Sequence, residues 1–166
     1  MAVLKIIKFP DNILRKKARK VRRVAKEEKQ LLADMAETMY LNNGVGLAAP
    51  QVGISKELIV IDVGEGLIKM ADPALSDMSG ECTMEEGCLS VPNTIANVKR
   101  AERLCVDFLT ERGERTRLIA EGLCARAIQH EIDHLRGRLI VDRLSPLKRF
   151  LLKRKALKGQ AKFYCQ

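Results

Sequence analysis

The sequence lacks several features, and each absence removes a class of protein. No apolar run approaches the ~18 residues that a membrane-spanning helix needs, so we expect no membrane protein. The first residues have no apolar signal core or cleavage site, which favours a cytosolic protein. The five cysteines are odd in number and have no CxxC spacing, which argues against a disulfide framework and fits a reducing compartment.

Negative charge is scarce at both ends of the chain. Residues 1–33 carry 11 Lys/Arg against 3 Asp/Glu, and residues 138–166 carry 9 against 1, whereas the middle is acidic and the whole chain has a net charge of +9. Basic ends are typical of a contact with nucleic acid or the ribosome, and equally of a solvated, solubilising face. Both interpretations stay open here.

Apolar periodicity and turn signals predict one α+β domain, because strands precede an isolated helix without βαβ alternation. We expect a short basic helix within residues 8–21, a helix over 26–40, strands at 57–63 and 67–72, and a loop-rich stretch over 72–93. Two strands flank a turn at Arg112 and Gly113. A helix follows over 122–137 with Gly137 just past its end, and a basic amphipathic helix begins at Leu147.

Both histidines of the chain lie in one short segment, AIQHEIDHLRG, residues 127–137. His130 and His134 are four residues apart, so on a helix both imidazoles lie on one face and can bind one metal ion. Glu131 is one step round the helix, where it can act on a water at the metal without being a ligand. The HExxH pattern therefore favours a metal centre over two ordinary histidines.

A third ligand is needed, and no histidine remains to supply it. Ile140 occupies the position where the metzincin pattern has its third histidine, and no glutamate follows His134, so Asp142 is the only carboxylate downstream. Cys88, in the segment EEGCLSVPN, is the best remaining candidate because a thiolate suits zinc or ferrous iron. The opposing interpretation is that a lone cysteine is a small buried apolar residue.

The segment GVGLAAPQVG, residues 44–53, combines glycines, small alanines and a proline. A backbone with so few side chains can line a cleft and offer N–H and C=O groups to an extended peptide. Gln51 is an uncharged donor that could bind a developing oxyanion. The alternative is a packed turn before the next strand.

Taken together, three segments resemble the peptide deformylase family in content and order: GVGLAAPQ at 44–51, EGCLS at 86–90 and HEIDH at 130–134. The resemblance spans nearly the whole chain and implies antiparallel β-sheets around a central helix carrying HExxH. It divides the chain into a catalytic metallohydrolase domain, 1–146, and a basic C-terminal helix and tail, 147–166, that belong to the same single domain. Asn43 and Asp72 stand where some relatives have Glu and Asn, which bears on peptide side-chain preference.

The resemblance implies removal of the formyl group from the N-terminal formylmethionine of newly made polypeptides, with release of formate. Cys88, His130 and His134 would bind one divalent metal, most commonly Fe²⁺, with Zn²⁺, Ni²⁺ or Co²⁺ as substitutes. Glu131 would be the general base, the Gln51 side chain and the Leu89 backbone N–H would bind the oxyanion, and Gly46 would hold the peptide backbone.

The implied partners are formylated nascent peptides and, through the basic C-terminal helix, the ribosome. A monomer in the bacterial cytoplasm is expected, and an organellar protein that has lost its leader would have the same sequence features. Two alternatives remain: a metallopeptidase with Asp142 as third ligand, and a non-enzymatic, basic ribosome- or RNA-binding protein with a structural metal. The metallopeptidase leaves the glycine-rich and EGCLS segments unexplained, and a structural metal site needs neither Glu131 nor Gln51.

Overall fold

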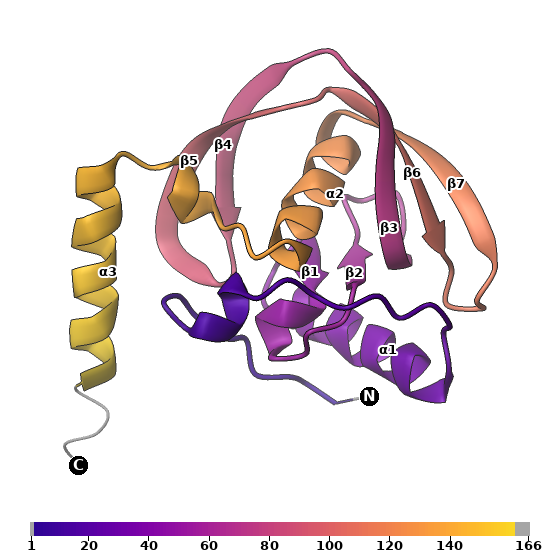
Figure 1. Cartoon of the computed structure of the whole chain (residues 1–166), viewed down its shortest axis with the longest axis horizontal. Helices are drawn as coiled ribbons and strands as arrows, with labels where there is room; N and C mark the ends of the chain where they lie inside the picture. The colour runs from indigo at the N-terminus through magenta and orange to yellow at the C-terminus, as the bar shows by residue number, and fades with distance from the viewer. Residues whose placement is uncertain (1, 162–166) are drawn as a thin grey trace.

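A computed structural model describes residues 2–161, with side chains described as far as residue 156. Two antiparallel sheets enclose one helix, α2 (Gly122–Leu135), as Figure 1 shows. The predicted α+β fold with antiparallel sheets around the HExxH helix is therefore confirmed.

The larger sheet has five strands in the order β1-β2-β3-β6-β7, and the smaller is the hairpin β4-β5. The bounds are β1 (Gly46–Ala48), β2 (Leu58–Ile61), β3 (Ile68–Ser79), β4 (Cys82–Cys88), β5 (Val91–Arg100), β6 (Arg103–Leu109) and β7 (Arg115–Glu121). Every ladder between these strands is antiparallel. The predicted hairpin around Gly113 is confirmed as β6-β7.

Helix α2 is buried along most of its length, because its apolar side chains pack on the large sheet. Ile128 and Ile132 share one core cluster with Ile59, Ile61 and Leu104 of the strands. Gly137 follows the helix with a φ of +71°, and a Cβ there would overlap the Arg15 carbonyl. Its predicted role as the residue that ends this helix is confirmed.

Helix α1 (Lys26–Leu41) agrees with the helix predicted over 26–40 and packs its apolar side on β1 and β2. The prediction of a helix within residues 8–21 was wrong, because only the short 3₁₀ turn η1 (Asn12–Arg15) forms there. Beyond it, Ala18 donates its N–H to the Leu135 carbonyl and Arg19 donates to the Ser55 carbonyl. Hydrogen bonds to distant segments thus replace the local ones that a helix would need.

The prediction of a loop-rich stretch over 72–93 was also wrong. These residues form the end of β3, all of β4 and the start of β5. Asp and Asn are residue types that are common in turns. Asp72, Asp77 and Asn93 do adopt positive φ, but within strands, and the β3-β6 register shifts on either side of Leu75. Bulges absorb the residues that would otherwise break the strands.

Helix α3 (Pro146–Ala161) stands beside the two sheets in Figure 1, so a C-terminal helix is confirmed. Its predicted apolar face is not buried: Phe150 and Leu151 are 57% and 53% exposed, while Leu152 packs on the cluster around η3 (Ile140–Arg143). The Leu157 side chain and the Cys165 residue lie outside the described part of the chain. Among the described residues, no helix is long and apolar enough to span a membrane.

Candidate active site

The fold brings together the three predicted metal ligands from two separate elements. Cys88 ends strand β4, and His130 and His134 lie one turn apart on α2. The thiol and one ring nitrogen from each histidine lie within 4.8 Å of one another, and Cys88 Sγ is 3.2 Å from His134 Nε2. Among the described residues this is the only group of three such side chains that converge closely enough to bind a metal ion.

The chemistry of the three donors fits a divalent transition metal. Burial lowers the pKa of His134 well below its usual value, so its imidazole is neutral and has a free lone pair. For His130, burial lowers the pKa, but hydrogen bonds with Cys88 and Glu86 outweigh it and raise the pKa to about 10. A proton held between a thiol and an imidazole is one that a bound cation displaces.

Glu86 fixes the orientation of the His130 ring. Burial raises its pKa, but hydrogen bonds from His130 and Arg100 outweigh this and hold the pKa at about 2, so the carboxylate accepts hydrogen bonds only. The His130 Nδ1 is 2.9 Å from Glu86 Oε2 and must therefore be the donor. With Nδ1 bound to Glu86, Nε2 is the ring nitrogen that would bind a metal once the cation displaces its proton.

Glu131 is buried between α2 and β1, and its Oε2 has no hydrogen-bond partner in the described structure. Burial raises its pKa to about 7, against the opposing effect of His130. A carboxyl group that titrates near neutrality can both take and return a proton. Gly46 gives it room, because a Cβ on Gly46 would overlap Glu131 Oε1.

Gln51 is buried in the 3₁₀ turn η2 (Ala49–Val52), with its side-chain amide held in one orientation. Its Oε1 accepts the Ala48 N–H at 2.7 Å, so its Nε2 is directed toward Ser90 Oγ at 3.3 Å and Cys88 Sγ at 3.6 Å. The amide N–H groups therefore lie beside the predicted ligands, where an uncharged donor can stabilise negative charge.

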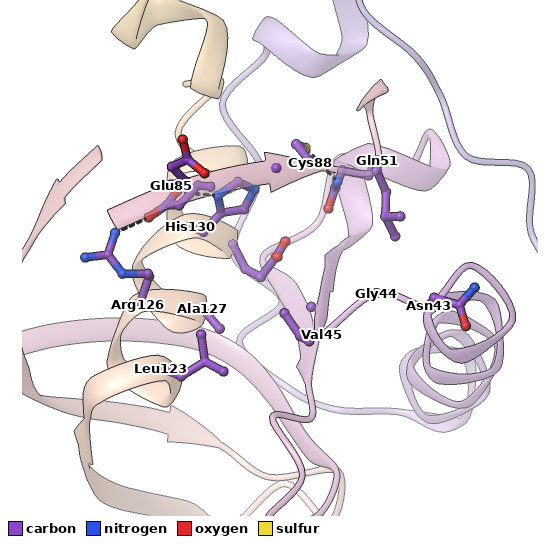
Figure 2. A pocket seen from close by; sticks show the side chains of 15 residues that line it. Asn43, Gly44, Val45, Gln51, Glu85, Cys88, Leu123, Arg126, Ala127 and His130 are labelled. Carbon is purple, nitrogen blue, oxygen red and sulfur yellow. Dashed lines mark hydrogen bonds and ion pairs between the residues drawn. The ribbon is translucent and has the colours of Figure 1, made fainter. Parts of the chain in front are cut away.

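A cavity of about 370 Å³ adjoins these residues and is shown in Figure 2. Gly46 and Leu89 line it, with Leu123 and Ala127 of α2 opposite Val45. Leu89 belongs to the tight turn between β4 and β5. Strand β1 is the last strand of the five-stranded sheet, so its free edge can pair with an extended peptide.

Two residues that the sequence analysis considered for the site, Asp142 and Asp72, instead make structural hydrogen bonds elsewhere in the fold. Asp142 accepts the Leu139 N–H at 3.0 Å and pairs with Arg15 at 2.6 Å, and it is not part of the converging donor group. Asp72 accepts the N–H groups of Val21 and Arg22, both at 2.7 Å, and anchors the N-terminal arm away from the cavity. Asn43, by contrast, lines the cavity.

Four buried polar residues around the predicted ligands were not among the site residues predicted from the sequence: Glu86, Arg100, Arg126 and Ser90. For two of them, the sequence spacing indicates a position near the ligands. Glu86 lies two residues before Cys88, and alternate residues of a strand share a face. Arg126 lies four residues before His130, which places both on one face of α2.

Comparison with known proteins identifies the family. The sequence model described as polypeptide deformylase matches residues 3–150. A peptide deformylase of Thermodesulfovibrio yellowstonii is 47% identical over 160 residues, which cover 93% of this chain and 97% of that protein. One from Pseudoalteromonas translucida is also 47% identical, over 98% of this chain and 99% of its own length.

Solved structures agree. A peptide deformylase from Legionella pneumophila has a TM-score of 0.89 and 43% identity, and the match covers 99% of both chains. One from Ehrlichia chaffeensis in complex with actinonin has a TM-score of 0.92 and 37% identity, over 96% of this chain and 98% of that one. This chain belongs to the polypeptide deformylase family.

Proposed function

We propose that Cys88, His130 and His134 bind one divalent metal in this chain, and that Glu131, Gln51, Leu89 and Gly46 carry out deformylation around it. Members of the family remove the N-terminal formyl group from nascent peptides, and the family depends on a metal. The observation that carries the proposal is the convergence of one thiol and two imidazoles, whose ligand atoms lie within 4.8 Å of one another. The buried Glu131 lies beside them.

The donor set favours Fe²⁺, because a thiolate makes the site softer than three imidazoles would. Zn²⁺, Ni²⁺ and Co²⁺ suit the same ligands. When bound, such a metal supplies Lewis-acid chemistry, polarising a carbonyl and lowering the pKa of water.

Residues of the chain would transfer the proton, stabilise the oxyanion and bind the peptide. Glu131 takes a proton from the attacking water and returns it to the leaving amine, a role that its pKa of about 7 supports. The Gln51 amide and the Leu89 N–H donate to the carbonyl oxygen as negative charge develops on it. The backbone of Gly46 pairs with the peptide along the free edge of β1.

The ribosome is the place where this substrate arises, which favours the bacterial cytoplasm as the site of action. Helix α3 supports a docking role, because it presents exposed cations, among them Lys153, Arg154 and Lys155, and exposed Phe150 and Leu151. A phosphate-rich surface attracts such a helix. Catalysis does not need α3, since every proposed catalytic residue precedes it.

The experiment measures formate release from a short formyl-methionyl peptide, together with metal content, under anaerobic conditions. The wild-type chain should hold about one metal per chain and release formate. Glu131→Ala should keep that metal while its turnover falls at least ~100-fold, because a general base is lost and no ligand is. Loss of the metal in this variant would make Glu131 a ligand and would contradict the assignment.

A further inference from the structure

We propose that Arg126 is a positioning residue for the metal centre, which fixes the β4-β5 hairpin against helix α2. The hairpin carries Cys88 and the helix carries both histidines, so the relative placement of these two elements sets the geometry of the three ligands. The inference rests on the proposed function, since it takes Cys88, His130 and His134 as the ligands.

The hydrogen bonds of Arg126 reach three separate points of the hairpin. Its Nη1 is 2.7 Å from Glu86 Oε1 and 2.9 Å from the Val98 carbonyl oxygen, and its Nη2 is 2.6 Å from the Cys82 carbonyl oxygen. These points lie at the start of β4, near its end and on β5. A planar guanidinium bound at three points holds the hairpin against both sliding and rotation relative to α2.

The contact with Glu86 passes directly to a metal ligand. One oxygen of Glu86 accepts from Arg126, and the other accepts from His130 Nδ1 at 2.9 Å. Arg126 and His130 are one turn apart on α2, so the helix, the arginine and the carboxylate form a closed ring that orients the imidazole. Figure 2 shows Arg126 and His130 on neighbouring turns of the helix beside the cavity.

Arg126 is not needed to neutralise the buried charge of Glu86, because a second arginine does so. Arg100 binds both oxygens of Glu86, at 3.0 and 2.9 Å, and also pairs with Asp133 at 2.6 Å. Glu86 therefore keeps a cationic partner when Arg126 is removed, and no buried carboxylate is left uncompensated. Loss of Arg126 removes the connection between the hairpin and the first turns of α2 and leaves the remaining pairs in place.

The test uses zinc as the probe and compares Arg126→Met with Arg126→Lys and with a control, Arg117→Met. Arg117 also makes a two-point pair with a carboxylate, Asp107, but on the exposed surface of β7. Zinc affinity is measured by competition with a chelator, thermal unfolding is measured with and without zinc, and ¹⁵N-histidine NMR reports the Nδ1–H of His130.

We expect Arg126→Met to bind zinc ~10- to 100-fold more weakly, as for other residues that orient metal ligands, and to show a shifted or broadened His130 Nδ1–H signal. Arg126→Lys, which can keep one hydrogen bond, should lie between this variant and the wild type, and Arg117→Met should match the wild type. If Arg126→Met does not fold, weaker zinc binding by Arg126→Lys carries the same conclusion.

Wild-type zinc affinity and a wild-type His130 signal in a folded Arg126→Met, or in Arg126→Lys where the methionine variant does not fold, would overturn the proposal. A variant that only unfolds at a lower temperature, with both of these readouts unchanged, would show a purely structural role and would also overturn it. A wild-type chain that fails to bind one zinc through Cys88 would instead contradict the proposed function.

Discussion

At the scale of single residues, the thiol is the assignment that the sequence left most open. Cys88 lies beside both histidines, whereas Cys82, Cys105 and Cys124 are partly buried outside the converging group. A catalytic site that loses one of three protein ligands binds its metal much more weakly.

We therefore expect Cys88→Ala to lose most of its metal while it stays folded, as measured by elemental analysis and circular dichroism. Parallel alanine variants of Cys82, Cys105, Cys124 and Cys165 serve as controls and should keep about one metal per chain. Metal loss in one of those controls, with metal retained in Cys88→Ala, would assign the site to a different thiol.

Gly46 offers a second test at this scale, because it has no side chain where Glu131 needs space. A Cβ at Gly46 would overlap Glu131 Oε1 and approach its Cγ and Cδ at 3.0 Å. The backbone of β1 pairs with β2 on its other side and cannot easily retreat. The glutamate would have to move instead.

We expect Gly46→Ala to lower formate release ~100-fold or more, with metal content unchanged, because a displaced general base loses its contact with the attacking water. The comparison is with Glu131→Ala: the double variant should be hardly slower than either single one, since both act on the same group. Fully additive losses would show that Gly46 acts through something other than Glu131.

At the scale of elements, periodic segments could be predicted and interrupted ones could not. Helices α1 and α2 follow the spacing of their apolar residues, and the two histidines needed only a helix to come together. The strand predicted at 67–72 is the start of β3 (Ile68–Ser79). The rest of β3, strand β4 and the start of β5 were missed because Asp72, Asp77 and Asn93 adopt positive φ inside strands, whereas Asp and Asn are common in turns.

The candidate site shows the same division. His130 and His134 are close in sequence, so local spacing predicted their convergence. Cys88 reaches them only because the β4-β5 hairpin folds over α2, which no local pattern encodes. Its assignment therefore depended on the resemblance of the whole segment EGCLS to a family. Arg100 was missed because its partners, Glu86 and Asp133, come from other elements.

Asp142 of η3 connects this 3₁₀ turn to η1 through its ion pair with Arg15, and the stability that it contributes should depend on pH. Its carboxylate is partly desolvated, which raises its pKa, but the hydrogen bonds from Arg15 and the Leu139 N–H outweigh this and lower the pKa. A carboxyl group whose folded pKa is lowered stabilises the protein above its unfolded pKa of about 3.9, and this stabilisation is lost as the pH falls through the folded value.

We expect wild type to be more stable than Asp142→Asn at pH 7, and the difference to shrink progressively once the pH falls below about 4. Urea midpoints measured from pH 7 down to pH 3 check this, with Asp77→Asn as a control because Asp77 lies in the exposed part of β3. A difference that persists undiminished at pH 3 would mean that Asp142 acts through packing and not through its charge.

At the scale of the whole molecule, positive charge is divided between two ends of the chain, while the proposed catalytic residues lie in the acidic middle. Helix α3 is attached to the rest by few described contacts, among them Arg149 to the Val141 and Asp142 carbonyls and Leu152 to the neighbouring core. Its other described cations are exposed, and Arg154 also lies over the Phe150 ring at 5.7 Å. This arrangement would separate the proposed docking from the proposed catalysis.

The last prediction uses that separation. Removing residues after Pro146 would also delete the contacts of Arg149 and Leu152, so charge reversal of Lys153, Arg154 and Lys155 to Glu tests docking more cleanly. A matched control reverses three other exposed cations: Lys16, Arg112 and Arg115. Because phosphate contacts release counterions, binding to ribosomes should be strong at low salt and weaken steeply as salt rises.

We expect the α3 variant to lose co-sedimentation with ribosomes at low salt while its formate release from a short formyl peptide stays within a few-fold of wild type. The control variant should keep both. Equal loss of co-sedimentation in the two variants would mean that net charge alone drives the association. Co-sedimentation that survives reversal in α3 would assign its cations to solubility, since a helix that docks on phosphate cannot tolerate the change from three positive to three negative charges.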